Sequence, residues 1–542
     1  MNTESTADVL LNLEPSKDRL LGVVYTPDDV ASELTRFALE RHHRVPNRIL
    51  EPSAGDGAFL RALADSTKAG LSVYGFDIDQ EAVDLLKKEF PAANFKCKDF
   101  IEYAVDYDGP KYDIVIGNPP YIRRHNFGEE LKESVERLSQ VASYPFSELK
   151  NAWAAFVVAS SMLLSDEGVL AFVVPYELLN LKYCQYLQAF LIENFGSVEI
   201  FTPHDKAFRE LDQDAVALIV SRAAPKANTG VTLSSVKSLA RLQPTRSRNI
   251  CFSGKQANSV DLNSIFFDDE TVALLHRLRS SLKTVGDYAS SSAGVVSAAN
   301  DFFILKSSEI NKRGLINWAR PILKKGAYLP PGPVFSESDL AEISTSKPAF
   351  LLDFVSGGAP ALTKKAECYI AEGEALGLNK RYKSRRRSPW YNVPIVEASD
   401  GIFFKRSHSF PRLSINEARV LVTDTAYQVT MHEGYSIRDL TYSFYNSLTL
   451  LFCEMDGRFY GGGVLELTPK EFRGIPIQFQ NPTELEFEEF VQKFPKSKSP
   501  EAANFDYTDR RMAQVLSLSV RQLAMVQEAL KTVRMHRLRH GS

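Results

Sequence analysis

The segment YDIVIGNPPYIRR, Tyr112 to Arg124, ends an apolar run with Asn-Pro-Pro-Tyr. Two consecutive prolines have no N–H to donate to a sheet, and they hold the preceding residue extended, so a buried strand is predicted to end at Gly117. We therefore expect Asn118 and Tyr121 to lie on a stiff, exposed corner at the end of a strand. Strand ends of this kind hold the chemistry of many α/β enzymes.

This corner could promote attack by an aromatic amine. The lone pair of such a nitrogen is delocalised into the ring, and two acceptors aimed at its N–H bonds would localise it. The Asn118 side-chain oxygen and the Pro119 carbonyl oxygen could supply them, held rigid by Pro120. Tyr121 would stack on the base, an interaction of roughly 1–3 kcal/mol. No cysteine lies in the segment, so no covalent enzyme intermediate is expected; the alternative interpretation is an ordinary Asx-proline turn.

Three acidic residues follow three successive predicted strands. Glu51 opens a small-residue turn, EPSAGDG, whose Gly55 allows a ligand to approach the backbone. Asp77 ends YGFD and could accept from both hydroxyls of a ribose, although a helix N-cap is an equally good interpretation. Asp99 could accept from an adenine amino group, with Phe100 against the ring. The glycine order is not G-x-G-x-x-G, and Glu51 would repel phosphates, so a cationic cofactor that carries an amino acid fits better than NAD.

NPPY, together with LEPSAGDG, FDID and KDF, resembles the gamma class of N6-adenine DNA methyltransferases of type II restriction–modification systems. The motif order is TaqI-like and the layout resembles PstI/BsuBI-type modification enzymes. The resemblance implies S-adenosyl-L-methionine as cofactor and a flipped-out adenine in double-stranded DNA as substrate. It also implies an α/β fold of the class I S-adenosylmethionine-dependent type, Rossmann-like, with a mainly parallel sheet and helices on both faces. A mixed C-terminal target recognition domain that ends in a long helix would follow.

The resemblance also assigns individual residues. It implies that Tyr25, Thr26 and Pro27 contact the methionine end of the cofactor, and that Phe156 packs on its adenine. Phe208 would stack on the flipped base, with Phe201 as the alternative. The predicted catalytic group is Asn118, Pro119, Pro120, Tyr121 and Phe208. The predicted cofactor-binding set is Tyr25, Thr26, Pro27, Glu51, Pro52, Ser53, Ala54, Gly55, Gly57, Asp77, Ile78, Asp99, Phe100, Asn118, Pro120 and Phe156.

The chain of 542 residues is too long for one core, and its periodicity predicts several parts. Alternating apolar runs and amphipathic stretches indicate a parallel sheet with helices, whereas the chain becomes loop-rich after Ser221. We expect a tail at 1–21, a catalytic domain at 22–245, a target recognition domain at 246–480 and a C-terminal helical segment at 481–542. One long amphipathic helix is predicted from Tyr507 to Arg537.

A duplex substrate requires local basic surface, because the formal net charge is only −3. The segment KRYKSRRRSPWY places six cations among aromatic residues, and Arg123 and Arg124 follow the proline corner. Such runs are often merely solvated, but beside this catalytic half DNA contact is the better hypothesis. The predicted DNA-binding residues are Arg123, Arg124, Lys380, Arg381, Lys383, Arg385, Arg386, Arg387, Trp390, Lys405 and Arg406.

Several classes of protein are disfavoured. The five scattered cysteines have no zinc-like spacing, so neither a metal site nor a disulfide framework is expected, and no apolar run is long enough to span a bilayer. The predictions are a cytoplasmic, prokaryotic monomer, with any cognate restriction endonuclease on a separate chain. The alternatives are an NPPY-type enzyme acting on RNA adenine or protein glutamine, and a non-catalytic DNA-binding protein with a relic core.

Overall fold

The computed structural model describes residues 25–66, 71–180, 184–204, 215–223, 230–251, 266–356, 359–460, 463–495 and 505–538. The chain divides between Phe266 and Phe267 into two compact units, called unit 1 and unit 2. The expected division at 245/246 falls inside β9 (Arg241–Cys251). Because β9 pairs antiparallel with β8 (Gly230–Ser238), it belongs to the sheet of unit 1.

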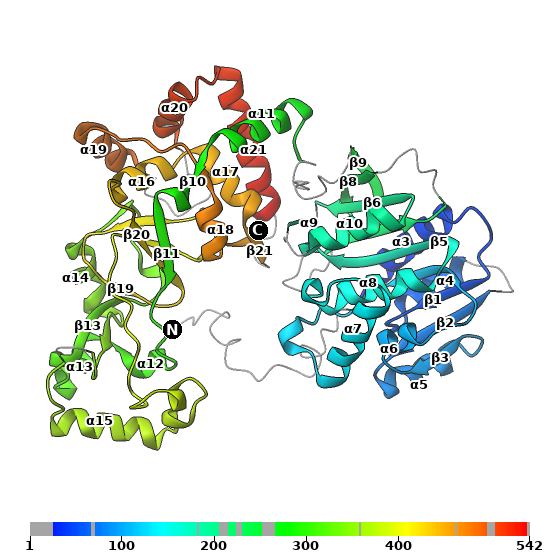
Figure 1. Ribbon diagram of the computed structural model, residues 1–542, viewed down its shortest axis with the longest axis horizontal. Helices are drawn as coiled ribbons and strands as arrows, with labels where there is room; N and C mark the ends of the chain where they lie inside the picture. Colours follow the sequence, from blue (N-terminus) through cyan, green and yellow to red (C-terminus); the bar gives the residue numbers. More distant parts are fainter. Residues whose placement is uncertain are drawn as a thin grey trace, which may run out of the picture. The chain divides into compact units, whose positions relative to one another are not determined.

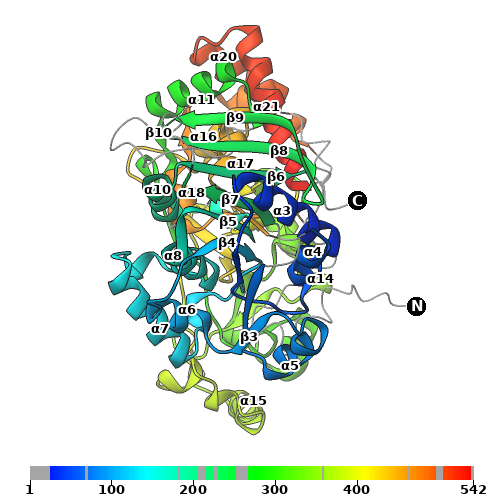
Figure 2. The ribbon, with the colours of Figure 1, turned by 90° about the vertical axis from the view of Figure 1, so that its right-hand side faces the viewer.

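Unit 1 contains a sheet with the strand order β3-β2-β1-β4-β5-β7-β6-β8-β9 (Figure 2). The first five pair in parallel, and β7 pairs antiparallel with both β5 and β6. This is the predicted α/β, class I methyltransferase topology. The strands not yet bounded are β1 (Arg48–Glu51), β2 (Ser72–Asp77), β3 (Asn94–Cys97), β4 (Tyr112–Gly117), β5 (Leu164–Pro175), β6 (Ser197–Pro203) and β7 (Ala215–Ser221).

Both faces of this sheet are buried. Ile114 and Ile116 of β4 pack in a core with apolar residues of α3 and α4, whereas Val115 between them points to the opposite face and is also buried. Three other helices of unit 1, α6, α7 and α8, pack against one another, and α8 packs against β5. The helices of unit 1 are α3 (Asp28–Arg41), α4 (Ala58–Ser66), α5 (Gln80–Glu89), α6 (Phe100–Val105), α7 (Glu129–Val141), α8 (Ala152–Leu163), α9 (Glu177–Asn180) and α10 (Cys184–Asn194).

Unit 2 is a mixed α and β structure, with a five-stranded sheet in the order β11-β20-β16-β18-β14 and a four-stranded sheet in the order β12-β15-β13-β19 (Figure 1). Its strands are β10 (Lys283–Thr284), β11 (Ala289–Ala293), β12 (Ile304–Leu305), β13 (Ala319–Leu323), β14 (Val334–Phe335), β15 (Phe350–Leu352), β16 (Gly401–Phe404), β17 (Arg406–Ser407), β18 (Leu413–Asn416), β19 (Leu421–Val422), β20 (Ala426–Met431), β21 (Arg458–Tyr460), β22 (Val464–Glu466) and β23 (Pro476–Ile477). Its helices are α11 (Asp269–Ser281), α12 (Asn300–Phe303), α13 (Ser307–Arg313), α14 (Glu337–Ser346), α15 (Lys364–Ala375), α16 (Ile437–Phe444), α17 (Ser447–Asp456), α18 (Pro469–Gly474), α19 (Glu484–Lys493), α20 (Asp506–Val515) and α21 (Val520–Leu538).

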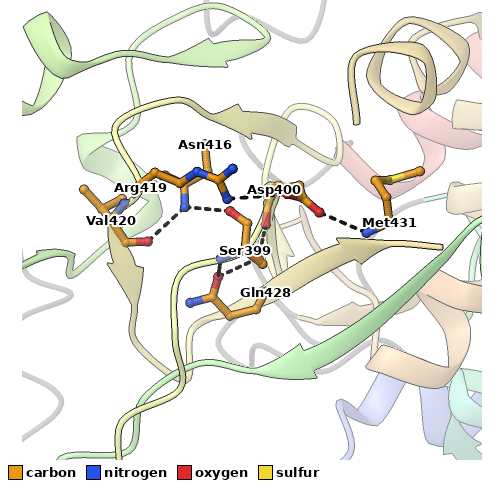
Figure 3. A network of polar contacts seen from close by, with 8 residues as sticks. Ser399, Asp400, Asn416, Arg419, Val420, Gln428 and Met431 are labelled. Atoms are coloured by element: carbon orange, nitrogen blue, oxygen red, sulfur yellow. Dashed lines mark hydrogen bonds and ion pairs between the residues drawn. The ribbon is translucent and has the colours of Figure 1, made fainter. Parts of the chain in front are cut away.

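A buried polar network joins β16, β18 and β20 within unit 2 (Figure 3). The Asn416 amide donates to the main-chain oxygens of Ser399 and Val420 at 3.1 and 2.9 Å. The Ser399 hydroxyl donates to the Gln428 side-chain oxygen at 2.7 Å, and the Met431 N–H donates to Asp400 at 3.1 Å. These side chains satisfy main-chain groups that would otherwise be costly to bury, so they fix the turns that join the strands.

The predicted single helix from Tyr507 to Arg537 is wrong in one respect, because it is interrupted. It forms α20 and α21 with a break at Ser517, which has a positive φ of 52°. The hydroxyl of Ser519 then accepts from the N–H of Gln522 at 3.2 Å, which caps the start of α21. Among the described residues, no helix is long and apolar enough to cross a membrane.

Candidate active site

The turn after β1 leads from Glu51 into α4. Gly55 and Gly57 both have positive φ, of 51° and 82°. A Cβ at Gly57 would lie 2.7 Å from the Leu86 side chain, whereas a Cβ at Gly55 would meet nothing within 4 Å. Gly57 is therefore required by packing as well as by conformation. The backbone at Gly55 lies open, as a ligand-binding turn requires.

Glu51 is a buried acid that makes no ion pair with the described residues of unit 1. Its side chain is only 1% exposed, and Oε2 has no hydrogen-bond partner among the residues that the structure describes. Burial, followed by the charges of Asp56 and Asp77, raises the pKa of Glu51 well above its ordinary value. A buried carboxyl group of this kind is suited to a cationic ligand, which would supply the hydrogen bond and the opposite charge that the carboxyl group lacks.

Asp77 lies half-buried at the tip of β2 and connects two loops. One carboxylate oxygen accepts from the Gly55 N–H and the other from the Asp79 N–H, each at 2.9 Å. Asp79, not Asp77, caps α5, since it accepts from the Glu81 N–H at 3.0 Å. The helix-cap alternative for Asp77 is therefore wrong. Each carboxylate oxygen keeps acceptor capacity beyond its one main-chain bond.

Asp99, in contrast, caps a helix. It accepts from the Glu102 N–H at 2.9 Å at the start of α6, and burial raises its pKa. Phe100 and Phe156 pack against each other with ring centroids 5.3 Å apart, and they are only 2% and 7% exposed. Neither ring presents a whole face to solvent. Their contact with an adenine remains a prediction.

The proline corner meets two other predicted motifs. At the tip of β4, the Asn118 amide nitrogen donates to the Thr26 hydroxyl at 3.1 Å, and the Ser53 hydroxyl donates to the main-chain oxygen of Asn118 at 3.0 Å. Thr26 is 7% exposed, Pro119 is buried and Pro120 half-buried. Residues separated by more than sixty positions are therefore held against Asn118 from two sides.

Tyr121 is not on an exposed corner as expected. It is 8% exposed, and its hydroxyl donates to the main-chain oxygen of Val173 on β5 at 3.3 Å. The end of β5 supplies both an acceptor and apolar neighbours, which makes burial favourable. The predicted residues at the surface are instead Tyr25 and Ile78, which are 57% and 59% exposed, and Pro27.

Of the two candidate base-stacking phenylalanines, Phe208 lies outside the described residues. Phe201 lies on β6, is 2% exposed and packs edge-to-face on Phe37 at 5.5 Å. A ring that is part of the core is unavailable to a base. The structure therefore disfavours Phe201 and leaves Phe208 as a prediction.

The cations beside the proline corner differ in their surroundings. Arg123 is exposed, and its backbone pairs with Asn151 ahead of α8. The Arg124 guanidinium lies 3.8 Å over the Phe146 ring and donates to the main-chain oxygen of that residue at 3.2 Å. Arg124 is therefore bound within unit 1 as well as available at its edge.

The predicted DNA-binding residues of unit 2 also divide into two groups. Arg387 donates to the main-chain oxygens of Ser297 and Val296 at 2.8 and 2.7 Å, and Trp390 packs in an apolar core and donates to Glu374 at 2.9 Å. Arg406 and Lys405 pair with the buried carboxylate of Glu466 at 2.6 and 3.4 Å. These four side chains form hydrogen bonds or ion pairs within unit 2 and so stabilise its fold. The other group, Lys380, Arg381, Lys383, Arg385 and Arg386, is exposed; Arg406 is exposed as well, although it pairs with Glu466.

Two family models match the chain. Residues 87–208 match the Eco57I restriction-modification methylase, and residues 260–512 match the C-terminal domain of the type II methyltransferase M.Eco57I. Together these matches cover more than half of the sequence, on both sides of the division between the units. The chain belongs to the type II restriction–modification methyltransferases. It is accordingly a DNA methyltransferase of a restriction–modification system.

Curated relatives agree with this assignment. The methyltransferase is 22% identical to the type II methyltransferase M.AccI of Acinetobacter calcoaceticus, over 68% of each chain. It is 21% identical to M.XamI of Xanthomonas campestris pv. amaranthicola, over 87% of this chain and 88% of the relative. It is 32% identical to M.TthHB8I of Thermus thermophilus, over 34% of this chain and 41% of that one.

Solved structures match the methyltransferase at low scores. The type IIG restriction endonuclease BpuSI gives a TM-score of 0.41 and 15% identity, over 96% of this chain and 67% of that chain. The DrdV–DNA complex gives a TM-score of 0.47 and 12% identity, over 90% and 60%. The assignment rests on the family models and the curated relatives.

Sequence patterns missed several contacts of the methyltransferase. Thr26 was expected at the cofactor's methionine end, but nothing in YTP predicts its bond to Asn118. The sequence also contains no pattern that predicts the bond of Ser53 to the proline corner, or the bonds of Arg387 to the main chain of unit 2. A hydrogen bond between distant segments has no local periodicity, so only the tertiary structure reveals it.

Replacing Thr26 by valine should test whether it orients the Asn118 amide. Valine keeps the volume but removes the acceptor, so the amide loses one anchor and kcat for methyl transfer should fall about 10-fold, as expected for one hydrogen bond of about 1.4 kcal/mol. Steady-state kinetics should place the loss in kcat rather than in KM for DNA. Thr26→Ser retains the hydroxyl and should recover most of the rate. An equal loss in the serine variant would contradict an orienting role.

The Glu51 carboxyl predicts a pH dependence of stability in the ligand-free enzyme. Because the pKa of Glu51 is raised above its ordinary value of 4.5, the folded chain holds this proton more tightly than the unfolded chain. The resulting stabilisation is complete below that ordinary value and is lost as the pH rises through the raised value. Glu51→Gln should therefore raise the free energy of unfolding at pH ~8 by roughly 1–3 kcal/mol, measured by urea denaturation. Glu133→Gln, an exposed site on α7, is the control and should change nothing.

Proposed function

We propose that this enzyme transfers a methyl group from S-adenosyl-L-methionine to the N6 amino group of a flipped-out adenine in double-stranded DNA. The observation that carries the proposal is the fixed amide of Asn118 at the tip of β4. Its nitrogen donates to the Thr26 hydroxyl at 3.1 Å, and the main-chain oxygen of the same residue accepts from the Ser53 hydroxyl at 3.0 Å. An amide with its nitrogen engaged on Thr26 has its oxygen directed elsewhere, as an acceptor for an amine requires.

The chemical role of this corner is to make an aromatic amine nucleophilic. The Asn118 oxygen and the Pro119 carbonyl would accept the two N–H bonds of the amine, which localises its lone pair. The nitrogen–carbon bond forms while the carbon–sulfur bond breaks, and the surplus proton of the amine passes to solvent. Because the two prolines fix the acceptors before the substrate binds, little reorganisation is needed at the moment of reaction.

The residues around the turn after β1 fit the cofactor. Glu51 has a buried oxygen for which the described residues supply no partner, which suits the ammonium group of an amino acid, and the open backbone at Gly55 allows close approach. Asp77 keeps acceptor capacity for ribose hydroxyls. When bound, S-adenosylmethionine supplies a methyl group activated by a sulfonium. Tyr25, Ile78 and Asp99 would border the same ligand.

An adenine in a duplex must leave the stack before its amino group can enter this site. Tyr121 and Phe208 are the proposed contacts of the extruded base. Tyr121 is anchored to Val173 by its hydroxyl and is largely buried, so we expect an edge or part of its ring to meet the base. Arg123 would contact phosphates near the target nucleotide.

The decisive experiment is methylation-aware sequencing of DNA from cells that express the protein, together with transfer of labelled methyl groups by the purified enzyme. We expect N6-methyladenine within one recognition sequence, and label on duplex DNA but not on RNA or protein. Label that appears on RNA, on polypeptide or on cytosine would contradict the proposal. A duplex with 2-aminopurine at the target adenine should also brighten on binding, because extrusion removes stacking.

A further inference from the structure

Unit 2 contains a pocket to which nothing above gives a function. Its volume is about 560 Å³. It is lined by the segment 296–302, which runs into α12, and by residues of α13, α15 and the segment that follows α15. That segment, 376–387, contains all six cations of KRYKSRRRSPWY, five of them exposed. The pocket therefore lies beside the predicted basic surface.

The turn before α12 is held in a strained conformation. Ala298 has a φ of 69°, in the left-handed region that a residue with a Cβ rarely adopts. Arg387 donates to the main-chain oxygens of Val296 and Ser297, and Arg381 donates to that of Ala298 at 3.2 Å. Burial lowers the pKa of Arg387, because removing its charge from water is unfavourable. Holding this turn with the Arg387 side chain therefore costs free energy. Strain that is held by such contacts is typical of preformed binding surfaces.

The charges that line the pocket are partly neutralised within unit 2. Arg313 pairs with Glu372 at 2.8 Å, and Asp301 pairs with Lys324 at 2.7 Å. Lys383 and Asp424 also line the pocket, and both are exposed. Neither makes an ion pair with any residue that the structure describes. Glu309 and Arg381 line the pocket too, but Glu309 accepts from the Lys306 N–H at 3.2 Å and Arg381 donates to Ala298. Lys383 and Asp424 are therefore the cationic donor and the anionic acceptor of the pocket whose side chains the described part of the chain does not bind.

Three more cations belong to the same run as the lining residues Arg381 and Lys383. Lys380, Arg385 and Arg386 are exposed, and the Arg386 guanidinium lies 4.2 Å from the ring centroid of Tyr382. Such cations are suited to phosphates. A carboxylate is not, because it repels them, so a surface that bound only the DNA backbone would gain nothing from Asp424. An exposed carboxylate in the same pocket as Lys383 is suited to the donor groups of base edges instead.

We propose that this pocket reads a G·C base pair of the recognition sequence, with Lys383 donating to guanine and Asp424 accepting from cytosine. In the major groove guanine presents the acceptors N7 and O6, and cytosine presents the donor N4–H₂, so one lysine and one carboxylate complement the pair. Lys380, Arg385 and Arg386 contact phosphates and fix the register. This inference rests on the proposed function, because it takes duplex DNA as the substrate.

The test is selection of bound sequences from a random duplex pool by the full-length protein, which requires no methyl transfer. The wild type should enrich one sequence that contains a G·C pair. Lys383→Ala and Asp424→Asn should each lose discrimination at that pair, by roughly 5- to 150-fold, while the other positions persist. Both side chains are exposed, so the variants should keep the wild-type melting temperature.

The matched control is the double variant Arg385→Ala/Arg386→Ala. It should weaken binding to all sequences alike and reduce the slope of log K against log salt by about 1 for each phosphate that the protein no longer neutralises. Unchanged base preference in both Lys383→Ala and Asp424→Asn would overturn the inference, as would a wild type that binds no duplex. A wild type that selects a sequence yet methylates no adenine would instead contradict the proposed function, and the base preferences of the two variants would still decide the inference.

Discussion

Replacing Asn118 by alanine is expected to lower kcat for methyl transfer by roughly 10²- to 10³-fold, the usual loss when one preorganised hydrogen-bonding group is removed from a reacting centre. The amide would accept one N–H of the target amine, and alanine leaves that bond unmade in the transition state. Asn118 bonds to Thr26 and Ser53, whereas the ammonium group of the cofactor would be held by Glu51, so cofactor affinity should change little. Single-turnover transfer of labelled methyl groups and calorimetric binding would separate the two quantities.

Asn194→Ala is the matched control. Asn194 is an exposed amide at the end of α10, where its nitrogen donates to the main-chain oxygen of Phe190 at 2.8 Å. Its loss should leave both transfer and binding unchanged. Asn118→Asp gives a further comparison, since aspartate keeps an acceptor but cannot donate to the Thr26 hydroxyl through an N–H. If Asn118→Ala transferred methyl groups at the wild-type rate, the acceptor mechanism would be wrong.

Replacing Arg537 by methionine is expected to destabilise unit 2 by about 3–5 kcal/mol, the usual cost of removing one member of a buried ion pair. Arg537 and Glu454 are fully buried and form two bonds, Nε–Oε2 and Nη2–Oε1, each of 2.7 Å. The same guanidinium donates to the main-chain oxygens of His408 and Gly463. The substitution would leave the two main-chain oxygens without this donor, and the buried carboxylate of Glu454 with only the more distant Arg534, at 3.7 Å.

Urea denaturation would measure this loss through the fluorescence of Trp318 and Trp390, both of which lie in unit 2. The matched control is Arg521→Met on the same helix, α21. The Arg521 side chain is 76% exposed and pairs with Glu270 at the surface, so its removal should cost less than about 1 kcal/mol. Equal effects of the two substitutions would show that burial of the α21 ion pair contributes nothing.

The buried pair also explains how the end of the chain is held. Arg534 lies one turn before Arg537 on α21, and its Nε is 3.7 Å from Oε1 of Glu454; burial lowers the pKa of Arg534. Two cations of one helix thus share a carboxylate of α17. The same helix also buries Val526, Leu530 and Val533, so both apolar packing and charged side chains anchor it.

The local chemistry of the sequence was sufficient to predict much of unit 1. YDIVIG forms β4 from Tyr112 to Gly117 because the apolar run favours a buried strand and two prolines end it. QEAVDLLKKE forms α5, as its amphipathic spacing predicts. The predicted helix from Tyr507 to Arg537 failed at Ser517, where a positive φ has no strong sequence signal.

By itself, then, the sequence determined the class of fold, the acidic strand ends and the rigid corner at Asn118, because proline, glycine and apolar periodicity restrict the backbone over a few residues. Only the tertiary structure decided that Thr26 and Ser53 hold that corner, that Tyr121 is buried, and that Asp99 caps a helix. It also decided which cations stabilise the fold. Arg387 and Lys383 belong to one basic run, yet Arg387 is bonded to the main chain at Ser297 whereas Lys383 lines a pocket. The physical reason is that the role of a charged or polar side chain depends on which residues it bonds to, and those residues lie far away in the chain. No pattern of neighbouring residues encodes those partners.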